Sequence, residues 1–337
     1  MEKIRPGALK FRFTAKGLHM LSIGIDIGGT KILGALVDQG GNILYEARVP
    51  SPAQDPDLMV DTVVELIKQV AGQTNEAIIG VGVAAAGFID AEQSTILYAP
   101  NLNWRNEPFR ERLQAKLDLQ VIIENDANAA GWAEFKFGAG FGTKDMILLT
   151  LGTGVGGAVV ADYKLRRGGF GIGGELGHVR VVQDGKQCGC GRKGCVEQYS
   201  SGTAVLKAAK KLAKSSGPAG QRLRELEAES GELTGKQVYQ ALLEGDLAVL
   251  GIFREAAAYL GQAMATMTAV LDPQIFVIGG GLSEAGETIL EPIRQAYLAD
   301  LPARGFRPEA QIVTAQFTNQ AGVIGAADLA RETLARL

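Results

Sequence analysis

The segment Leu21–Asp38 reads LSIGIDIGGTKILGALVD and contains two apolar, β-type runs that meet at a glycine pair. A third run of the same kind, NILYEARV, follows a second Gly-Gly turn. Short β-type runs separated by glycine turns are typical of an antiparallel meander. The pattern of strand, glycine turn and strand recurs at Met146–Asp162, which reads MILLTLGTGVGGAVVAD, so the sequence predicts an internal duplication.

Strands and helices alternate through the rest of the chain. The predicted helices are 56–70, 108–117, one from about residue 127, 247–271, 287–298 and one from about residue 323; the predicted strands between them are 77–84, 121–125, 275–280 and a run near 312–317. The 247–271 helix is the clearest, because its apolar residues recur at spacings of three and four. Alternation of this kind predicts a two-domain α/β protein.

The expected organisation has three parts. Residues 1–20 form a basic N-terminal arm, either frayed or upstream of a natural start at Met20. Residues 21–135 form a small α/β domain, and residues 136–322 form a larger one. The last helix, 323–337, is expected to pack back on the small domain.

Composition excludes several functional classes. The chain has 337 residues, with 34 Lys and Arg against 37 Asp and Glu, so it lacks the basic surface that a nucleic-acid backbone requires. No apolar run reaches the roughly 18 residues that would cross a bilayer. Three cysteines cannot form a disulfide framework, and no signal segment opens the chain. We therefore expect a cytoplasmic protein without nucleic-acid or membrane partners.

Glycine is concentrated in the middle of the chain, where 17 of the 57 residues from Gly138 to Gly194 are Gly. Glycine permits backbone conformations and close approaches that other residues do not, so this region is expected to form shaped loops. Three glycine turns could bind phosphate: Asp26–Lys31, Gly152–Gly157 and Ile278–Ser283. The second has the G-x-G-x-x-G spacing, but a strand follows it instead of a helix, which argues against a dinucleotide site. Each turn alone could be an ordinary connection; together they predict a cleft for a nucleoside triphosphate.

Asp126 stands where a strand ends and a helix begins. An Asp there can simply cap the helix. It can also serve as the carboxylate that accepts a hydroxyl proton during phosphoryl transfer. Its neighbour Asn125 offers both a donor and an acceptor to a sugar hydroxyl.

All three cysteines lie in one short segment, CGCGRKGC, from Cys188 to Cys195. With His178 they make a Cys₃His set, which has the ligand types and number of a structural zinc site. Glu175 and Glu197 flank this set and could accept hydrogen bonds from a neutral polyol. The alternatives are buried thiols without a metal and solvated glutamates.

The motifs DIGGTK, ENDANAA, LGTGVGG, GELGH, CGCGRKGCVEQ and VIGGGLS occur in this order from Leu21 onward. Together they resemble the ROK family of repressors and sugar kinases over essentially the whole chain after Leu21. Within that family the chain looks most like the bacterial ATP-dependent glucokinases of the actinobacterial type.

The resemblance implies an actin/hexokinase-like (ribonuclease H-like) duplicated α/β fold with two domains around a cleft. It implies transfer of the ATP γ-phosphoryl group to the 6-hydroxyl of glucose with Mg²⁺, a structural Zn²⁺, and a homodimer or homotetramer. It makes Asp126 the catalytic base. By the same match, the sugar contacts are Asn101, Asn125, Asp126, Glu175, His178 and Glu197; the nucleotide contacts are Asp26, Gly28, Gly29, Thr30, Lys31, Gly152, Thr153, Gly154, Gly279, Gly280 and Gly281; and the zinc ligands are His178, Cys188, Cys190 and Cys195.

Two alternatives remain at this stage. One is a ROK kinase for another hexose, such as N-acetylglucosamine, N-acetylmannosamine or fructose. The other is a ROK repressor that senses a sugar, although about 20 residues before Leu21 leave no room for a helix-turn-helix domain.

Overall fold

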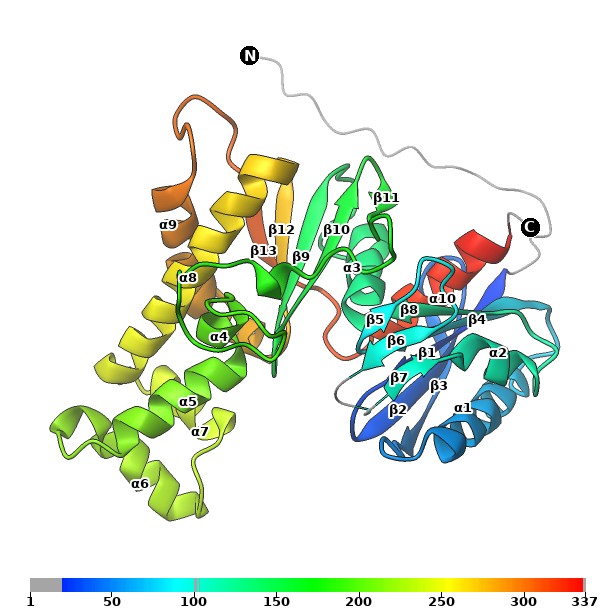
Figure 1. The fold of residues 1–337 in the computed structure, drawn as a ribbon, viewed down its shortest axis with the longest axis horizontal. Helices are drawn as coiled ribbons and strands as arrows, with labels where there is room; N and C mark the ends of the chain where they lie inside the picture. Colours follow the sequence, from blue (N-terminus) through cyan, green and yellow to red (C-terminus); the bar gives the residue numbers. More distant parts are fainter. Residues whose placement is uncertain (1–19, 100–101, 103, 336–337) are drawn as a thin grey trace.

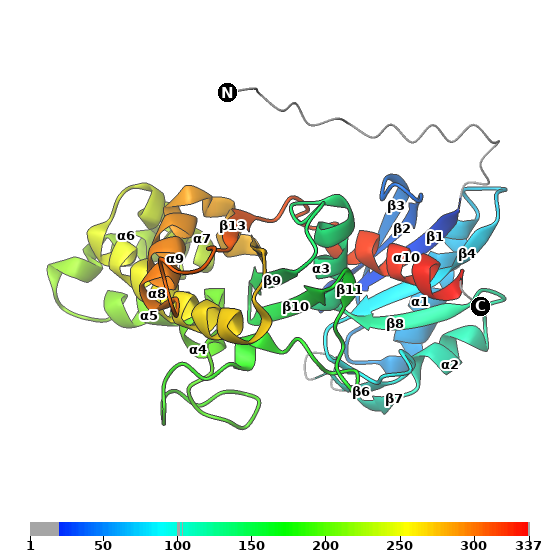
Figure 2. The ribbon, with the colours of Figure 1, turned by 90° about the horizontal axis from the view of Figure 1, so that it is seen from above.

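The computed structural model describes residues 20–99, 102 and 104–335 (Figure 1). The expected N-terminal arm therefore lies outside the described residues, apart from Met20. The described residues form two five-stranded sheets and one three-stranded sheet. The two large sheets lie in the two halves of the molecule, with helices between and around them (Figures 1 and 2).

The first sheet has the strand order β3-β2-β1-β4-β8. Strands β1 to β3 form the predicted antiparallel meander, and β4 and β8 extend it in parallel. Its strands are β1 (Leu21–Ile27), β2 (Lys31–Val37), β3 (Ile43–Pro50), β4 (Ile78–Ala85) and β8 (Val121–Asn125).

The second sheet repeats this plan with the order β11-β10-β9-β12-β13. Again a meander of three strands is extended in parallel by two later ones. Its strands are β9 (Met146–Leu151), β10 (Val155–Ala161), β11 (Lys164–Leu165), β12 (Ile275–Gly279) and β13 (Gln311–Thr314). The matching strand order confirms the predicted duplication.

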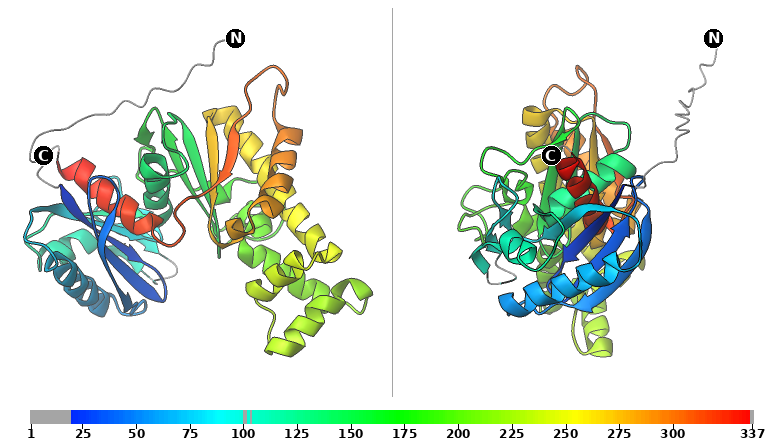
Figure 3. Two further views of the ribbon diagram at one scale, coloured as in Figure 1. Left: turned by 180° about the vertical axis from the view of Figure 1, so that it is seen from behind. Right: turned by 90° about the vertical axis from the view of Figure 1, so that its right-hand side faces the viewer.

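The helices divide into those that cover outer faces and those that lie between the sheets. Helices α1 (Pro56–Ala71) and α2 (Phe109–Gln114) pack on the outer face of the first sheet. The second half carries α4 (Glu197–Ser200), α5 (Gly202–Ala213), α6 (Gln221–Ser230), α7 (Gly235–Leu243), α8 (Leu247–Leu271) and α9 (Glu287–Asp300). Figure 3 shows α5 to α7 as a helical projection beyond this sheet.

Helices α3 (Asp126–Phe137) and α10 (Ala321–Leu334) lie between the two large sheets. The alternation of side chains along β9 shows the arrangement, because Ile147 and Leu149 join a core with α8 and α9. Met146 and Leu148, on the opposite face of the same strand, pack instead with residues of α3 and α10. Each central helix follows the last strand of its half, so the two helices are equivalent in the duplication.

Glycines in the strands allow α10 to lie directly on the first sheet. A Cβ on Gly24 would be 1.9 Å from the carbonyl oxygen of Val323, and one on Gly82 would be 1.9 Å from that of Ala326. Distances under 3 Å are not tolerated without a shift of the backbone. Some glycines of this chain therefore allow close packing of a helix on a sheet, and do not form turns near a ligand.

Replacement of Gly82 by Ala is expected to lower the free energy of unfolding by about 3 kcal/mol, because the added methyl group forces α10 away from β4. Urea unfolding measures the change. Gly251→Ala in α8 is the matched control, since a Cβ there meets open space and Ala favours helix. Equal stability of Gly82→Ala and the native chain would contradict this packing.

Several elements differ from the sequence-based expectation. Helix α2 is shorter than the predicted 108–117. Strands β5 (Phe88–Ile89), β6 (Ile96–Ala99) and β7 (Trp104–Glu107) form the small third sheet, which the sequence did not reveal. These strands pair with close neighbours in the sequence, but each is too short to show an alternating pattern of apolar and polar residues. No helix among the described residues is long and apolar enough to cross a membrane.

Candidate active site

The candidate site begins at the carboxyl ends of three parallel strands. Asp26 in β1 pairs with Ala84 in β4, and Ala85 pairs with Asn125 at the end of β8. Polar groups at the ends of β1 and β8 are thus brought to the same edge of the first sheet. Asp26 lies on the face that α10 covers, since a Cβ on Gly322 would be 2.8 Å from its carboxylate.

Asn125, and not Asp126, is the N-cap of α3. The Oδ1 atom of Asn125 accepts a hydrogen bond from Asn128 N at 3.0 Å, and its Nδ2 donates to Gly87 O at 3.0 Å. The possibility that Asp126 serves as the cap is therefore wrong. Asp126 is the first helical residue, and within the described part of the chain its Oδ1 accepts a local bond from Ala127 N at 2.8 Å and none from a distant residue. Its carboxylate remains available to a ligand.

Charge interactions link four acidic side chains, Asp26 and Asp126 at this edge and Glu175 and Glu197 from the second half of the chain. Burial, and then the charge of Asp126, raise the pKa of Asp26 to about 7, against a smaller opposing effect of Lys31. Burial also raises the pKa of Asp126. The pKa of Glu175 is raised to about 7 by burial and by the charges of Asp126 and Glu197. A group of carboxylates that repel one another is suited to share protons or a cation.

The predicted phosphate turns lie at the ends of the strands. Gly28 N donates to Lys31 O in the β1–β2 hairpin, where Gly29, Thr30 and Lys31 are exposed. In the β9–β10 hairpin, Gly152 N donates to Gly154 O, and Thr153 is exposed. This turn joins two antiparallel strands and opens no helix, so it is not a dinucleotide-binding fingerprint, as the sequence indicates.

The third glycine turn lies beside the second. Gly279 at the end of β12 pairs with Thr150 in β9. Gly280 has φ +82°, and a Cβ on it would be 2.6 Å from Leu151 O. The segment Gly281–Ala285 forms a 3₁₀ turn, and α9 begins at Glu287, where the sequence predicts a helix after this turn. The structure thus brings the turns of Gly152–Gly154 and Gly279–Gly281 together.

The Cys₃His set forms a compact cluster in which all four ligand atoms lie within 4.8 Å of one another. His178 Nδ1 lies 3.6 Å from Cys188 Sγ, and Cys190 Sγ lies 3.6 Å from Cys195 Sγ. A tetrahedral zinc ion, with metal–sulfur bonds of about 2.3 Å, places its sulfur ligands about 3.8 Å apart. Burial raises the pKa of Cys195 to about 12, so a cation is needed to hold it as a thiolate. The residues fit a zinc ion.

The metal cluster and the strand ends are joined through two glutamates. His178 directs Nε2 toward Glu175, whose Oε2 lies 3.7 Å away. Glu197 accepts from Val155 N at 3.2 Å with Oε2, and its Oε1 lies 3.7 Å from Cys188 Sγ. The cluster therefore orients Glu175, His178 and Glu197 next to the Gly152–Gly154 turn. Asn101, the remaining expected sugar contact, lies outside the described residues.

A buried ion pair beside this site, between Glu124 and Arg167, was not predicted from the sequence. Glu124 ends the apolar run VIIE in β8, and its side chain is only 2% exposed. A buried carboxylate requires partners, and Arg167 supplies one at 2.6 Å. An acidic residue within an apolar strand indicates that a basic residue from elsewhere in the sequence packs beside it.

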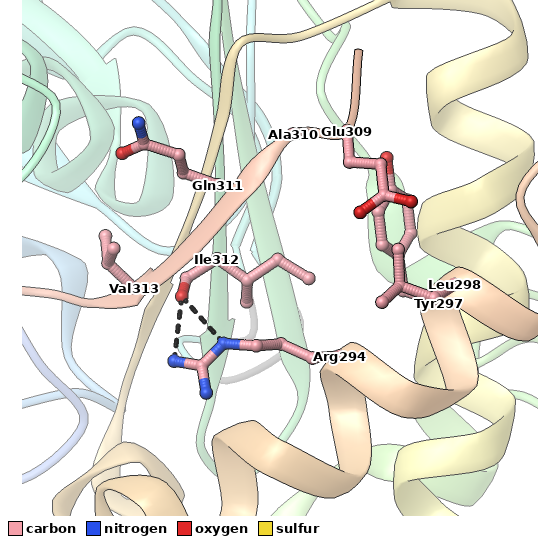
Figure 4. A pocket seen from close by; sticks show the side chains of 8 residues that line it. All are labelled: Arg294, Tyr297, Leu298, Glu309, Ala310, Gln311, Ile312 and Val313. Carbon is pink, nitrogen blue, oxygen red and sulfur yellow. Dashed lines mark hydrogen bonds between the residues drawn. The ribbon is translucent and has the colours of Figure 1, made fainter. Parts of the chain in front are cut away.

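A cavity of about 340 Å³ lies elsewhere, between α9 and the edge strand β13 (Figure 4). Its most polar group is Arg294, which donates to Glu287, Glu291 and the carbonyl oxygen of Ile312. These bonds occupy all the donors of the guanidinium group. The cavity contains none of the acidic residues or glycine turns described above, so it is not the candidate active site.

Comparison with known proteins agrees with this geometry. The model of the ROK family matches residues 22–333. The chain belongs to the ROK family. Its ROK fold confirms both the resemblance seen in the motifs and the predicted duplicated α/β architecture.

Two bacterial glucokinases are similar to this ROK-family chain. The Streptomyces coelicolor enzyme is 43% identical over 313 residues, which cover 93% of this chain and 98% of the relative. The glucokinase of Halalkalibacterium halodurans is 37% identical over 319 residues, which cover 92% and 94%. Among solved structures, a ROK family glucokinase from Streptomyces griseus, in complex with glucose and AMPPNP, is 42% identical with a TM-score of 0.82. That alignment covers 93% of this chain and 99% of the other.

Proposed function

We propose that this ROK-family chain is an ATP-dependent glucokinase, which transfers the γ-phosphoryl group of ATP to the 6-hydroxyl of glucose. The observation that carries the proposal is the grouping of Asp126 with Asp26, Glu175 and Glu197, supported by electrostatic coupling and by the shared strand ends. The similarity to glucokinases over nearly the whole chain supports glucose and ATP as the substrates.

Asp126 is proposed as the general base. Its carboxylate accepts the proton of the 6-hydroxyl as that oxygen bonds to the γ-phosphorus, while the bond to the leaving ADP breaks. Burial moves the pKa of Asp126 toward neutral pH, and a carboxylate with a higher pKa is a stronger base. Because Asn125 caps the helix, the Asp126 carboxylate is not needed as the cap. Among the described residues it accepts a hydrogen bond from its neighbour Ala127, so it can contact the substrate without breaking a cap.

The glycine turns are proposed to hold the nucleotide. Backbone N–H groups and the hydroxyls of Thr30 and Thr153 would contact phosphate, and Gly279–Gly281 would lie near the adenosine. The pair Asp26 and Asp126 fits a divalent cation, because a cation would relieve the repulsion that raises the pKa of Asp26. When bound, Mg²⁺ would neutralise charge on the β- and γ-phosphates.

The sugar is proposed to contact Asn101, Asn125, Glu175, His178 and Glu197, as well as Asp126. The glutamates accept hydrogen bonds from sugar hydroxyls, and the amide of Asn125 has one N–H left after its bond to Gly87. Zinc at His178, Cys188, Cys190 and Cys195 would act structurally, fixing the imidazole so that Nε2 faces the sugar.

The larger organisation is part of the same proposal. Residues 21–135 with the last helix, and residues 136–322, are proposed as the two domains that close over the substrates and exclude water. Thiolate ligands require reduced cysteines, which favours the cytoplasm. A homodimer or homotetramer is the proposed assembly.

The test is a coupled assay with ATP and a panel of glucose, mannose, fructose, N-acetylglucosamine and N-acetylmannosamine. We expect kcat/KM to be highest for glucose, by at least about tenfold, because hydroxyl-specific hydrogen bonds discriminate strongly between sugars. Higher kcat/KM with an N-acetyl sugar would instead identify a kinase for that sugar. Binding of a sugar without turnover of any would contradict the enzyme and favour a sensor.

A further inference from the structure

Residues 166–175, here called the strap, connect the second sheet to the first half of the molecule. The strap follows β11 and ends at Glu175. At Gly171, where φ is +85°, a Cβ would lie 2.6 Å from Ile89 O and 2.5 Å from the carbonyl carbon of Asp90. The strap backbone therefore lies directly against the segment that follows β5, in the first half.

A buried ion pair anchors the beginning of the strap. Arg167 Nε lies 2.6 Å from Glu124 Oε2, and the side chains are 25% and 2% exposed. The pair joins residues 43 positions apart, one from each half of the duplication. Arg167 is the cation beside the carboxylate at the end of β8.

Both oxygens of Glu124 are used completely. Oε2 accepts from Arg167 Nε and from Gln93 Nε2 at 3.2 Å. Oε1 accepts from Asn125 N and from Asn128 Nδ2, each at 3.0 Å. Two of these four donors belong to the residues that form the start of α3. The carboxylate thus connects Arg167 to the backbone of Asn125, next to Asp126.

The end of the strap also lies against α3. Asn128 Oδ1 is buried and has no hydrogen-bond partner within the described part of the chain. It faces the strap, since a Cβ on Gly174 would lie 3.4 Å from it. Gly174 has φ +94° and immediately precedes Glu175. The strap therefore contacts the first turn of α3 at both ends: Arg167 is bonded to it through Glu124, and Gly174, which precedes Glu175, lies next to Asn128.

Stability alone does not account for this arrangement. A buried ion pair often contributes little net stability, because the cost of removing both charges from water offsets their attraction. Loss of one partner, however, leaves a buried charge without compensation, and the surrounding groups must move. Here the groups that would move include the backbone of Asn125 and the side chain of Asn128.

We propose that Arg167 is a positioning residue for phosphoryl transfer. Through Glu124 it fixes the start of α3, and through the strap it fixes Glu175. The distance between the base Asp126, in the first half, and the sugar contact Glu175, in the second half, is thereby maintained. This inference rests on the proposed function, because it assigns Arg167 an effect on the sugar side of that site. The nucleotide turns at Gly28 and Gly152 make no contact with the network among the hydrogen bonds of the described residues.

Arg167→Met is expected to lower kcat/KM for glucose by about 100-fold, through both a lower kcat and a higher KM, since a misplacement of about 1 Å has this effect. The KM for ATP is expected to change less than about twofold. Steady-state kinetics with each substrate varied in turn measure both. Arg166→Met removes an exposed arginine from the same segment and is expected to retain native kinetics.

The double variant Arg167→Met/Glu124→Gln tests the route through Glu124. Removal of the buried charge along with its partner is expected to restore kcat/KM at least about tenfold relative to Arg167→Met. The amide of Glu124→Gln can keep the bonds from Asn125 and Asn128 through its oxygen, while its nitrogen donates to a flipped Gln93. Arg167→Lys, which keeps the charge without the Nε geometry, should fall between the native chain and Arg167→Met.

The outcomes separate the inference from the function on which it rests. Absence of sugar phosphorylation by the native chain would remove the proposed function. Native turnover with unchanged kinetics in Arg167→Met, even with a lowered melting temperature, would overturn only the positioning role. The same conclusion would follow if the double variant were no better than Arg167→Met, or if the KM for ATP rose as much as that for glucose. If Arg167→Met does not fold, Arg167→Lys takes its place, and native kinetics with both substrates in Arg167→Lys would then overturn the positioning role.

Discussion

Asp126→Asn is expected to lower kcat for glucose by at least about 1,000-fold while the dissociation constant for glucose changes only a few-fold. The amide has nearly the shape of the carboxylate but cannot accept the proton of the 6-hydroxyl. Coupled kinetics measure kcat, and isothermal titration calorimetry measures glucose binding. Because Asn125 supplies the cap of α3, the melting temperature should remain close to that of the native chain.

Two further measurements make this result specific. Asp55→Asn alters another Asp at the start of a helix, the N-cap of α1, and should retain activity. The native profile of kcat against pH should fall on acidification at a pH above the ordinary pKa of Asp, because burial raises the pKa of Asp126 and the base must be ionised. A kcat for Asp126→Asn within tenfold of the native value would remove Asp126 as the base.

Cys195→Ser is expected to abolish zinc binding and to lower kcat/KM for glucose by at least about 100-fold. The thiol is completely buried and lies 3.6 Å from Cys190 Sγ, so its loss breaks the tetrahedral set. Without the metal, His178 and Glu197 lose the group that orients them toward the sugar. Plasma mass spectrometry of the freshly purified native chain should find about one zinc per chain, and the variant should contain almost none.

The control for the metal loop is Gly189→Ala, which lies between two ligands where a Cβ meets open space. It should retain both zinc and activity. Less than half an equivalent of zinc in the native protein would contradict the Cys₃His proposal. So would full glucokinase activity in a metal-free Cys195→Ser variant. Thermal unfolding of both variants separates a loss of fold from a loss of orientation.

The elements that the sequence predicted best are those with long or repeated patterns. Helix 247–271 was predicted with the bounds that the structure has, because 25 residues with regular apolar spacing leave little ambiguity. The two meanders were recognised from the repeated strand, turn and strand pattern. Strands β5 to β7 were missed, since runs of two to four residues carry no period of their own.

The residues of the candidate site also fall into those that the sequence predicted and those that only the structure shows. The motifs around Asp126, Cys188 and Gly152 are contiguous, so their residue types and spacing already indicated a base, metal ligands and phosphate turns. The roles of Asn125 as the cap and of Arg167 as the partner of Glu124 were not visible. A cap depends on backbone angles at one residue, and the ion pair joins segments 43 residues apart.

The sequence by itself determined the family, the duplicated strand plan and the chemical types of the groups at the site, because local patterns of glycine, apolar residues and ligands encode them. Only the tertiary structure decided which distant groups meet. It laid α10 on Gly24 and Gly82, brought Gly280 to the β9 turn, and closed the strap over Glu124. Such contacts depend on packing and burial across the whole fold, and no local pattern specifies them.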